Sequence, residues 1–133
     1  MIEFADLSVT YRGDATLGAV HALRSIDLDV AEGEFVSLIG PSGCGKSTML
    51  RVAADLLEPS GGRARVAGVS PRETRLARRI GMVFQDPALL EWRSVLGNVL
   101  LPLEIMGRPR AEARKRALEM IALVGLAGFE QAR

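Results

Sequence analysis

The sequence predicts an α/β fold, and three observations predict it. Apolar residues alternate with polar ones over the first 30 positions, which is typical of an antiparallel β layer. An apolar strand pattern, a glycine-rich loop and an apolar-periodic helix follow one another between residues 35 and 57. The last third of the chain is rich in helix formers. We therefore expect a core over residues 1–87 and the start of a helical region over residues 88–133.

The antiparallel layer is expected to open the chain. Apolar residues of segment 2–9 alternate with polar ones, but the phase slips between Phe4 and Leu7, which predicts a strand with a bulge. After a turn over residues 12–18, apolar residues and aspartates alternate over residues 26–30. This pattern predicts a second, half-exposed strand.

The core is expected to continue with buried strands. Two nearly continuous apolar runs, residues 35–39 and 80–84, are typical of strands that are covered on both faces. Between them, helical periodicity begins at Lys46 and stops at Pro59. A short strand is expected over residues 63–67. We therefore expect a strand, a loop and a helix in direct succession.

The helical region is clearest over residues 110–124, which end at Gly125. Glu112 and Arg116 are four positions apart and are expected to form an ion pair on the exposed face. The expected buried face consists of Ala113, Ala117, Ile121 and Val124.

Composition excludes several classes of protein. Seventeen basic and sixteen acidic residues leave a net charge of +1, so no whole-molecule field would attract nucleic acid. No run approaches the roughly 18 apolar residues of a membrane span, and the N-terminus lacks the order of a signal peptide. Cys44 is the single cysteine, which is compatible with a reducing compartment. We interpret the chain as cytosolic.

A phosphate-binding loop is the strongest motif. The pattern G-x-x-x-x-G-K-[ST] is matched by Gly40, Pro41, Ser42, Gly43, Cys44, Gly45, Lys46 and Ser47. Glycines at 40, 43 and 45 permit positive φ, so backbone N–H groups can converge on a phosphate at a helix N-terminus. Lys46 would place its charge at the β- and γ-phosphates, Ser47 would bind Mg²⁺, and Thr48 would add a hydroxyl near the α-phosphate. The motif predicts a P-loop NTPase core.

Three further motifs accompany the loop in a fixed order. They are Glu32-Gly33-Glu34-Phe35 before it, Glu58-Pro59-Ser60-Gly61-Gly62 after its helix, and Val83-Phe84-Gln85 in the second apolar run. With these motifs, essentially the whole chain resembles the ATP-binding subunits of ABC transporters. The resemblance implies ATP and Mg²⁺ as cofactors and a role in the import of a small solute.

The same resemblance implies partners and a location. The partners would be transmembrane permease subunits, a second ATP-binding subunit that completes a dimer, and a solute-binding protein, with no nucleic acid. The location would be the cytoplasmic face of the inner (plasma) membrane. The wording Leu90-Glu91-Trp92 followed by Asn98-Val99 is most similar to the nitrate, sulfonate and taurine importer group.

Individual roles also follow from the resemblance. Tyr11 would stack on the adenine ring, for which a flat aromatic face is suited; the alternative is a tyrosine that caps a hairpin edge. Lys46 and Gln85 would be catalytic, with Gln85 also reaching Mg²⁺. Segment 87–92, with the apolar residues Leu89, Leu90 and Trp92, would face the transmembrane subunit, or would simply pack within the helical region.

The sequence departs from the family in several ways. Asp55 stands where most members have glycine. The family's Leu-Ser-Gly-Gly-Gln signature, its Walker B strand and its switch histidine have no match. We therefore expect an N-terminal portion of the family's domain that does not hydrolyse ATP alone. A non-transport ABC-type ATPase and an inactive nucleotide-binding fragment remain alternatives. A GTPase would show Asn-Lys-x-Asp, which is absent from the sequence.

Overall fold

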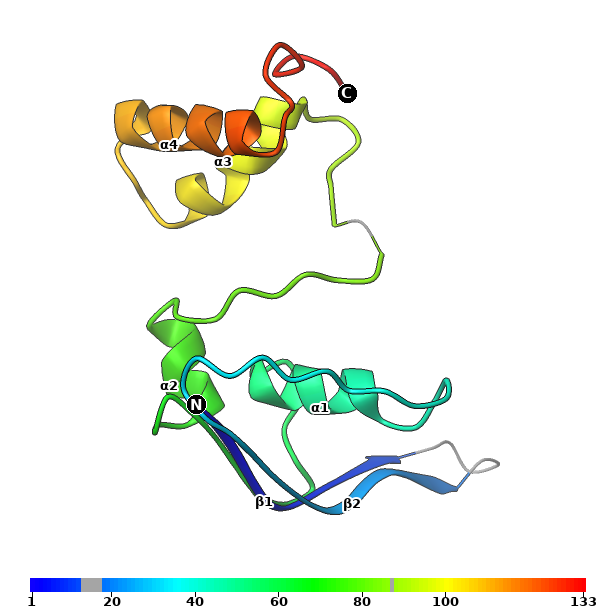
Figure 1. Cartoon of the computed structure of the whole chain (residues 1–133). Helices are drawn as coiled ribbons and strands as arrows, with labels where there is room; N and C mark the ends of the chain where they lie inside the picture. Colours follow the sequence, from blue (N-terminus) through cyan, green and yellow to red (C-terminus); the bar gives the residue numbers. More distant parts are fainter. Residues whose placement is uncertain (13–17, 87) are drawn as a thin grey trace. The chain divides into compact units, whose positions relative to one another are not determined.

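The computed structural model describes residues 1–12, 18–86 and 88–133. Within them the chain divides into two compact units, Met1–Val83 and Phe84–Arg133 (Figure 1). The boundary expected after residue 87 lies close to this division. Most of the turn expected over residues 12–18 falls outside the described residues.

A three-stranded antiparallel sheet forms one layer of the first unit. Its central strand β1 (Ile2–Arg12) pairs with β2 (Ala19–Val30) on one side and with β3 (Gly61–Val66) on the other. The register between β1 and β2 shifts between Phe4 and Leu7. The predicted antiparallel layer, its bulge and the short third strand are therefore confirmed.

The helix after the glycine-rich loop covers one face of this sheet (Figure 1). This helix, α1 (Lys46–Ala53), contributes Val52 to a core whose other buried members come from β1 and β2. They are Phe4, Leu7, Val9 and Leu23. Because these apolar side chains fix α1 on the sheet, they also fix the start of the helix, where the loop ends.

The end of α1 explains the unusual residue at position 55. Asp55 adopts a left-handed conformation with φ of 55°. Its N–H bonds to the carbonyl of Val52, and the N–H of Leu56 bonds to the carbonyl of Arg51. This pair of bonds is the Schellman motif, whose left-handed position is usually glycine. The helix therefore ends earlier than the periodicity up to Pro59 predicts.

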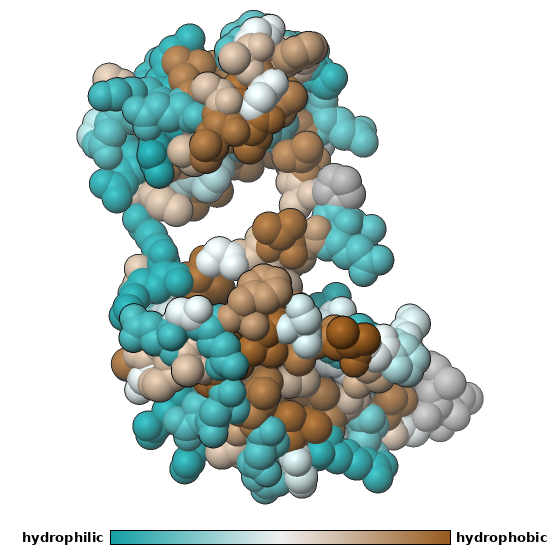
Figure 2. Space-filling view, viewed as in Figure 1, coloured by the Kyte–Doolittle hydropathy of each residue, from teal (hydrophilic) through white to brown (hydrophobic). Residues whose placement is uncertain are grey.

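The two predicted buried strands are wrong for this structure. Residues 35–39 and 80–84 have no strand assignment, and Phe35, Ile39 and Val83 are more than 90% exposed. A covered strand needs hydrogen-bonded neighbours and side chains above and below it. The described residues supply neither for these runs. Apolar surface is accordingly visible on the space-filling view (Figure 2).

A short helix that the sequence analysis missed follows β3. This helix, α2 (Pro71–Leu76), begins with a capping box. The Ser70 hydroxyl accepts a hydrogen bond from the N–H of Glu73 at 3.2 Å, and the Glu73 carboxylate accepts one from the N–H of Ser70 at 2.9 Å. Serine followed directly by proline and, three positions after the serine, by glutamate is a known signal for the start of a helix. This helix could therefore have been predicted from the sequence.

Two helices build the second unit. They are α3 (Val95–Ile105) and α4 (Arg110–Leu123), and they pack together through Leu96, Ala117 and Ile121. The predicted helix and most of its buried face are confirmed, but Val124 lies beyond the helix and is 66% exposed.

The predicted ion pair of this helix is also wrong. Glu112 pairs instead with Arg108 at 3.5 Å, and Arg116 pairs with Glu119 at 3.3 Å. The observed and the predicted partners are all three or four positions apart, and exposed pairs of this kind differ little in energy. Sequence spacing alone therefore cannot select between them.

Candidate functional site

The glycine-rich loop enters α1 through two residues with left-handed backbones. Gly43 has φ of 79° and Gly45 has φ of 99°. The expectation of positive φ is wrong for Gly40. A Cβ at Gly40 would lie 2.8 Å from the Cys44 Sγ. A side chain at position 40 would therefore require the Cys44 side chain to move.

Strand β2 packs against the loop at Gly45. A Cβ at Gly45 would lie 2.6 Å from Leu23 Cδ2 and 2.7 Å from the carbonyl oxygen of Ala22. Gly45 is buried at this contact. The sequence analysis did not identify Ala22 and Leu23 as supports, because no local pattern links them to a loop more than 20 positions away.

Backbone donors collect where the loop meets the helix. No side chain caps the N-terminus of α1, and its first turn contains no acidic residue. Within the described residues, the N–H groups of Gly43, Gly45, Lys46 and Ser47 find no acceptor in the protein. Unpaired N–H groups at a helix N-terminus are suited to bind an anion. The loop therefore fits a phosphate group.

The Lys46 ammonium lies across this loop. Its Nζ donates to the carbonyl oxygens of Gly40 at 2.8 Å and Pro41 at 2.6 Å, and lies 3.3 Å from the Cys44 Sγ. An ammonium has three N–H donors, so these contacts occupy its full capacity. A phosphate would compete with the two carbonyls for the same charge.

Two hydroxyls follow the lysine on α1. Ser47 is exposed at the loop end of the helix, while Thr48 is buried. A hydroxyl oxygen is a suitable ligand for Mg²⁺, which prefers oxygen donors and retains water. No group of three or more His, Cys, Asp or Glu side chains in the described ranges could hold a metal ion. The Ser47 hydroxyl is a chemically suitable ligand for a magnesium ion, which would take its other ligands from phosphate and water.

The aromatic residue and the loop come together in the first unit. The Tyr11 hydroxyl lies 3.3 Å from the Thr48 Oγ1, and the Tyr11 side chain is partly exposed. The proposed adenine platform therefore touches the helix that carries the phosphate loop.

Gln85 is not part of the first unit, which contains the loop. It belongs to the second unit and is exposed there. Its catalytic and metal-binding roles stay predictions.

The segment before α3 forms an exposed apolar loop, whose position 87 lies outside the described residues. Leu89 and Trp92 are largely exposed, and Leu89 lines a hollow of about 350 Å³. Asn98 holds the loop, because its side chain accepts from the Leu90 N–H at 2.8 Å and donates to the carbonyls of Leu90 and Arg93. This role of Asn98 was not predicted from the sequence.

Comparisons with known proteins agree with these features. The family model described as "ABC transporter" matches residues 23–133. The methionine import ATP-binding protein MetN of Cupriavidus necator is 46% identical over 98% of this chain and 39% of its own length. The taurine import ATP-binding protein TauB of Pseudomonas putida is 43% identical over the whole chain and 48% of its own length. The chain thus spans less than half of these two relatives.

A solved structure is similar as well. The ATP-binding cassette MJ0796, described as a dimer in a post-hydrolysis state bound to ADP and Pi, superposes with a TM-score of 0.85 at 35% identity. The match covers 98% of this chain and 60% of the cassette. Among the described residues, no helix has both the length and the apolar character to cross a membrane.

Proposed function

The chain belongs to the ABC transporter family, and from that membership we propose that it is the nucleotide-binding part of an ATP-binding subunit. The subunit would couple ATP binding and hydrolysis to the import of a small solute. One observation carries the proposal: the loop from Gly40 to Lys46 presents unpaired N–H donors beside a lysine ammonium. Such a combination is suited to hold phosphate groups.

Each part of the loop would contact a different part of the ligand. The N–H groups of Gly43, Gly45 and Lys46 would hold the β-phosphate, and the Lys46 ammonium would leave the loop carbonyls for the phosphate oxygens. The Ser47 hydroxyl would hold Mg²⁺, which supplies positive charge at the phosphates when it is bound. Tyr11 would stack on the adenine ring.

The remaining roles depend on partners. Gln85 would reach Mg²⁺ and the attacking water, as the family resemblance implies. The exposed loop with Leu89 and Trp92 would dock on a transmembrane permease subunit, because exposed apolar clusters often mark interaction sites. The protein would then lie at the cytoplasmic face of the membrane. A second ATP-binding subunit would complete a dimer, and a solute-binding protein would deliver the solute.

We further propose that the chain by itself binds ATP without turning it over. Hydrolysis needs a carboxylate near the attacking water and another that supports Mg²⁺. No apolar run of the sequence ends in Asp-Glu. Steady phosphate release by the purified 133-residue chain with MgATP, compared with its Lys46→Ala variant, measures this. Turnover that depends on Lys46 would show that a catalytic carboxylate has been overlooked.

The loop assignment is tested by ATP affinity. Lys46→Ala should weaken MgATP binding about 10- to 100-fold, because a hydrogen bond to a charged group contributes about 1.5–3 kcal/mol. Lys115→Ala is the matched control, since Lys115 is the other lysine and lies exposed on α4. Equal losses in the two variants would contradict the assignment.

A further inference from the structure

The side chain of Ser60 takes the place of a strand residue beside the end of β1. The register of β1 and β3 ends at the pair Ser8 and Gly61, so Thr10 lies beyond the last β3 partner. The N–H of Ser60 donates to the Ser8 carbonyl at 2.8 Å, and the Ser60 Oγ accepts from the N–H of Thr10 at 2.9 Å. The same hydroxyl donates to the carbonyl of Thr10 at 3.4 Å. One serine therefore bonds both backbone groups of Thr10, as a residue of a neighbouring antiparallel strand would.

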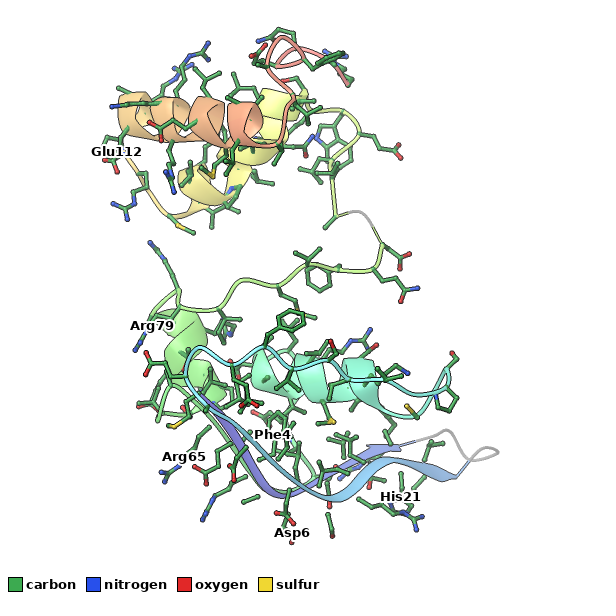
Figure 3. The ribbon with its side chains drawn as sticks, viewed as in Figure 1. Phe4, Asp6, His21, Arg65, Arg79 and Glu112 are labelled. Carbon is green, nitrogen blue, oxygen red and sulfur yellow. The ribbon has the colours of Figure 1, made fainter. Side chains whose placement is uncertain are left out.

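The same part of β1 is also held from its other neighbour, β2. The Thr10 Oγ1 lies 2.9 Å from the Nδ1 of His21, which Figure 3 labels on β2. The next residue, Tyr11, is opposite Val20 in the register of the two strands. The backbone at the end of β1 is therefore held by strand pairing on the β2 side and by Ser60 on the β3 side.

This end of β1 carries the aromatic ring that is expected to stack on adenine. The ring of Tyr11 has 37% of its surface exposed, so a flat ligand can reach it. Without Ser60, the strand beyond Ser8 would keep only its β2 neighbour, and segments with few contacts open locally at little cost. Ordering the backbone before a ligand arrives reduces the entropy that is lost on binding. A fixed strand end therefore favours stacking on Tyr11.

We propose that Ser60 is a positioning residue for the adenine base, and that it acts by holding the strand end that carries Tyr11. This inference rests on the proposed nucleotide-binding function. Ser60 lies between α1 and β3 in the chain, 50 positions after Thr10. The segment that leaves the phosphate-binding helix thus returns to β1 and orders the site for the base.

Two ligands separate this role from a general effect on the site. ATP has both a base and a triphosphate, whereas inorganic tripolyphosphate has only the phosphates. A residue that acts through the aromatic ring affects the binding of ATP alone. A residue that acts on the phosphate loop affects both ligands.

The experiment measures the affinities of both ligands by calorimetry, with Mg²⁺, on the purified protein. Ser60→Ala removes the hydroxyl and should weaken ATP binding about 2- to 10-fold, the range expected for a neutral hydrogen bond. Ser60→Thr keeps a hydroxyl and should bind ATP like the wild type. Ser60→Cys keeps the shape of the side chain with a weaker donor and acceptor, so its loss should be smaller than that of Ser60→Ala. All three variants should bind tripolyphosphate like the wild type.

Ser8→Ala is the matched control. Ser8 lies on the same strand, and its hydroxyl also bonds a backbone group, because it accepts from the N–H of Ser25 at 3.0 Å. Thermal melts should show a similar loss of stability for Ser8→Ala and Ser60→Ala, but Ser8→Ala should leave the affinity for ATP unchanged. Tyr11→Ala is the second control. Because Ser60 acts through the ring, Ser60→Ala should cause no further loss of ATP affinity in the Tyr11→Ala variant.

Three results would overturn the proposal. The first is a Ser60→Ala variant that binds ATP like the wild type, and the second is one that loses affinity for tripolyphosphate as much as for ATP. The third is a further loss of ATP affinity from Ser60→Ala in the Tyr11→Ala variant, because independent effects multiply. Lys46→Ala separates this inference from the proposed function, since wild-type binding of both ligands by that variant would contradict the nucleotide site itself.

Discussion

Replacement of Gly45 by alanine tests whether the antiparallel layer supports the phosphate loop. Two terms contribute to the expected loss of stability. Gly45 has φ of 99°, a conformation that costs an L-residue about 1–2 kcal/mol. The added methyl group would also lie 2.6 Å from Leu23 Cδ2 and 2.7 Å from the Ala22 carbonyl oxygen. Overpacking of this kind costs about 1–3 kcal/mol. The sum is about 2–5 kcal/mol.

Gly43→Ala is the matched control for this variant. Gly43 also has a left-handed backbone, with φ of 79°, but nothing lies within 4 Å of the position of its added methyl group. Its substitution should therefore cost the backbone term alone, about 1–2 kcal/mol. The difference between the two variants isolates the contact between Gly45 and β2.

The assay is urea denaturation followed by circular dichroism, which reports the unfolding of secondary structure. The free energy of unfolding of Gly45→Ala should fall below that of Gly43→Ala by about 1–3 kcal/mol. Equal losses in the two variants would refute the reasoning, because they would show that β2 moves away from the loop without cost.

Three further predictions concern neighbouring features. Alkylation of Cys44, which is exposed in the loop, should slow when MgATP is bound, and equal rates with and without nucleotide would contradict a loop that holds phosphate. Asp55→Ala should destabilise the protein by about 1 kcal/mol, because alanine tolerates the left-handed backbone less well than aspartate and the ion pair with Arg75 is lost. Asp55→Gly should change the free energy of unfolding by less than about 1 kcal/mol. Glycine adopts the left-handed backbone easily, which offsets the loss of the partly exposed ion pair with Arg75. A denaturation experiment in which Asp55→Gly is less stable than Asp55→Ala would refute this. Hydrogen bonds from the Ser70 side chain and backbone hold the pKa of Glu73 below its usual value. The capping box therefore stabilises the fold fully above about pH 4.3, and this stabilisation is lost as the pH falls through the lowered pKa. Ser70→Ala should raise that pKa in an NMR titration, and an unchanged value would be evidence against the capping box.

Local patterns predicted the features that depend on local interactions. The bulge between Phe4 and Leu7 changes the face on which successive apolar residues lie, so it is visible in the alternation itself. The face of α4 that contains Ala113, Ala117 and Ile121 is likewise set by the 3.6-residue period of one helix. In both cases the residues that make the pattern are the residues that form the structure.

The errors in the strands arose where structure depends on distant partners. An apolar run such as residues 35–39 predicts a strand only if another strand is present to pair with it, and periodicity contains no information about that neighbour. The contact between Tyr11 and Thr48 also joins distant segments. The resemblance to a family suggested a role for each residue separately, but the bond between their hydroxyls needed the structure.

The loop keeps its backbone shape although the residues before it do not form a strand. Residues 35–39 have no strand ladder among the described residues, yet Gly43 and Gly45 still adopt the left-handed backbones that turn their N–H groups inward. The preceding strand therefore does not impose the shape of the loop. Three contacts remain that can do so: the bonds from Lys46 to the loop carbonyls, the packing of Gly45 on β2, and the attachment of α1 to the core. Two of these depend on the antiparallel layer. Substitutions in β2, far from any phosphate in the sequence, should therefore affect nucleotide binding as well as stability.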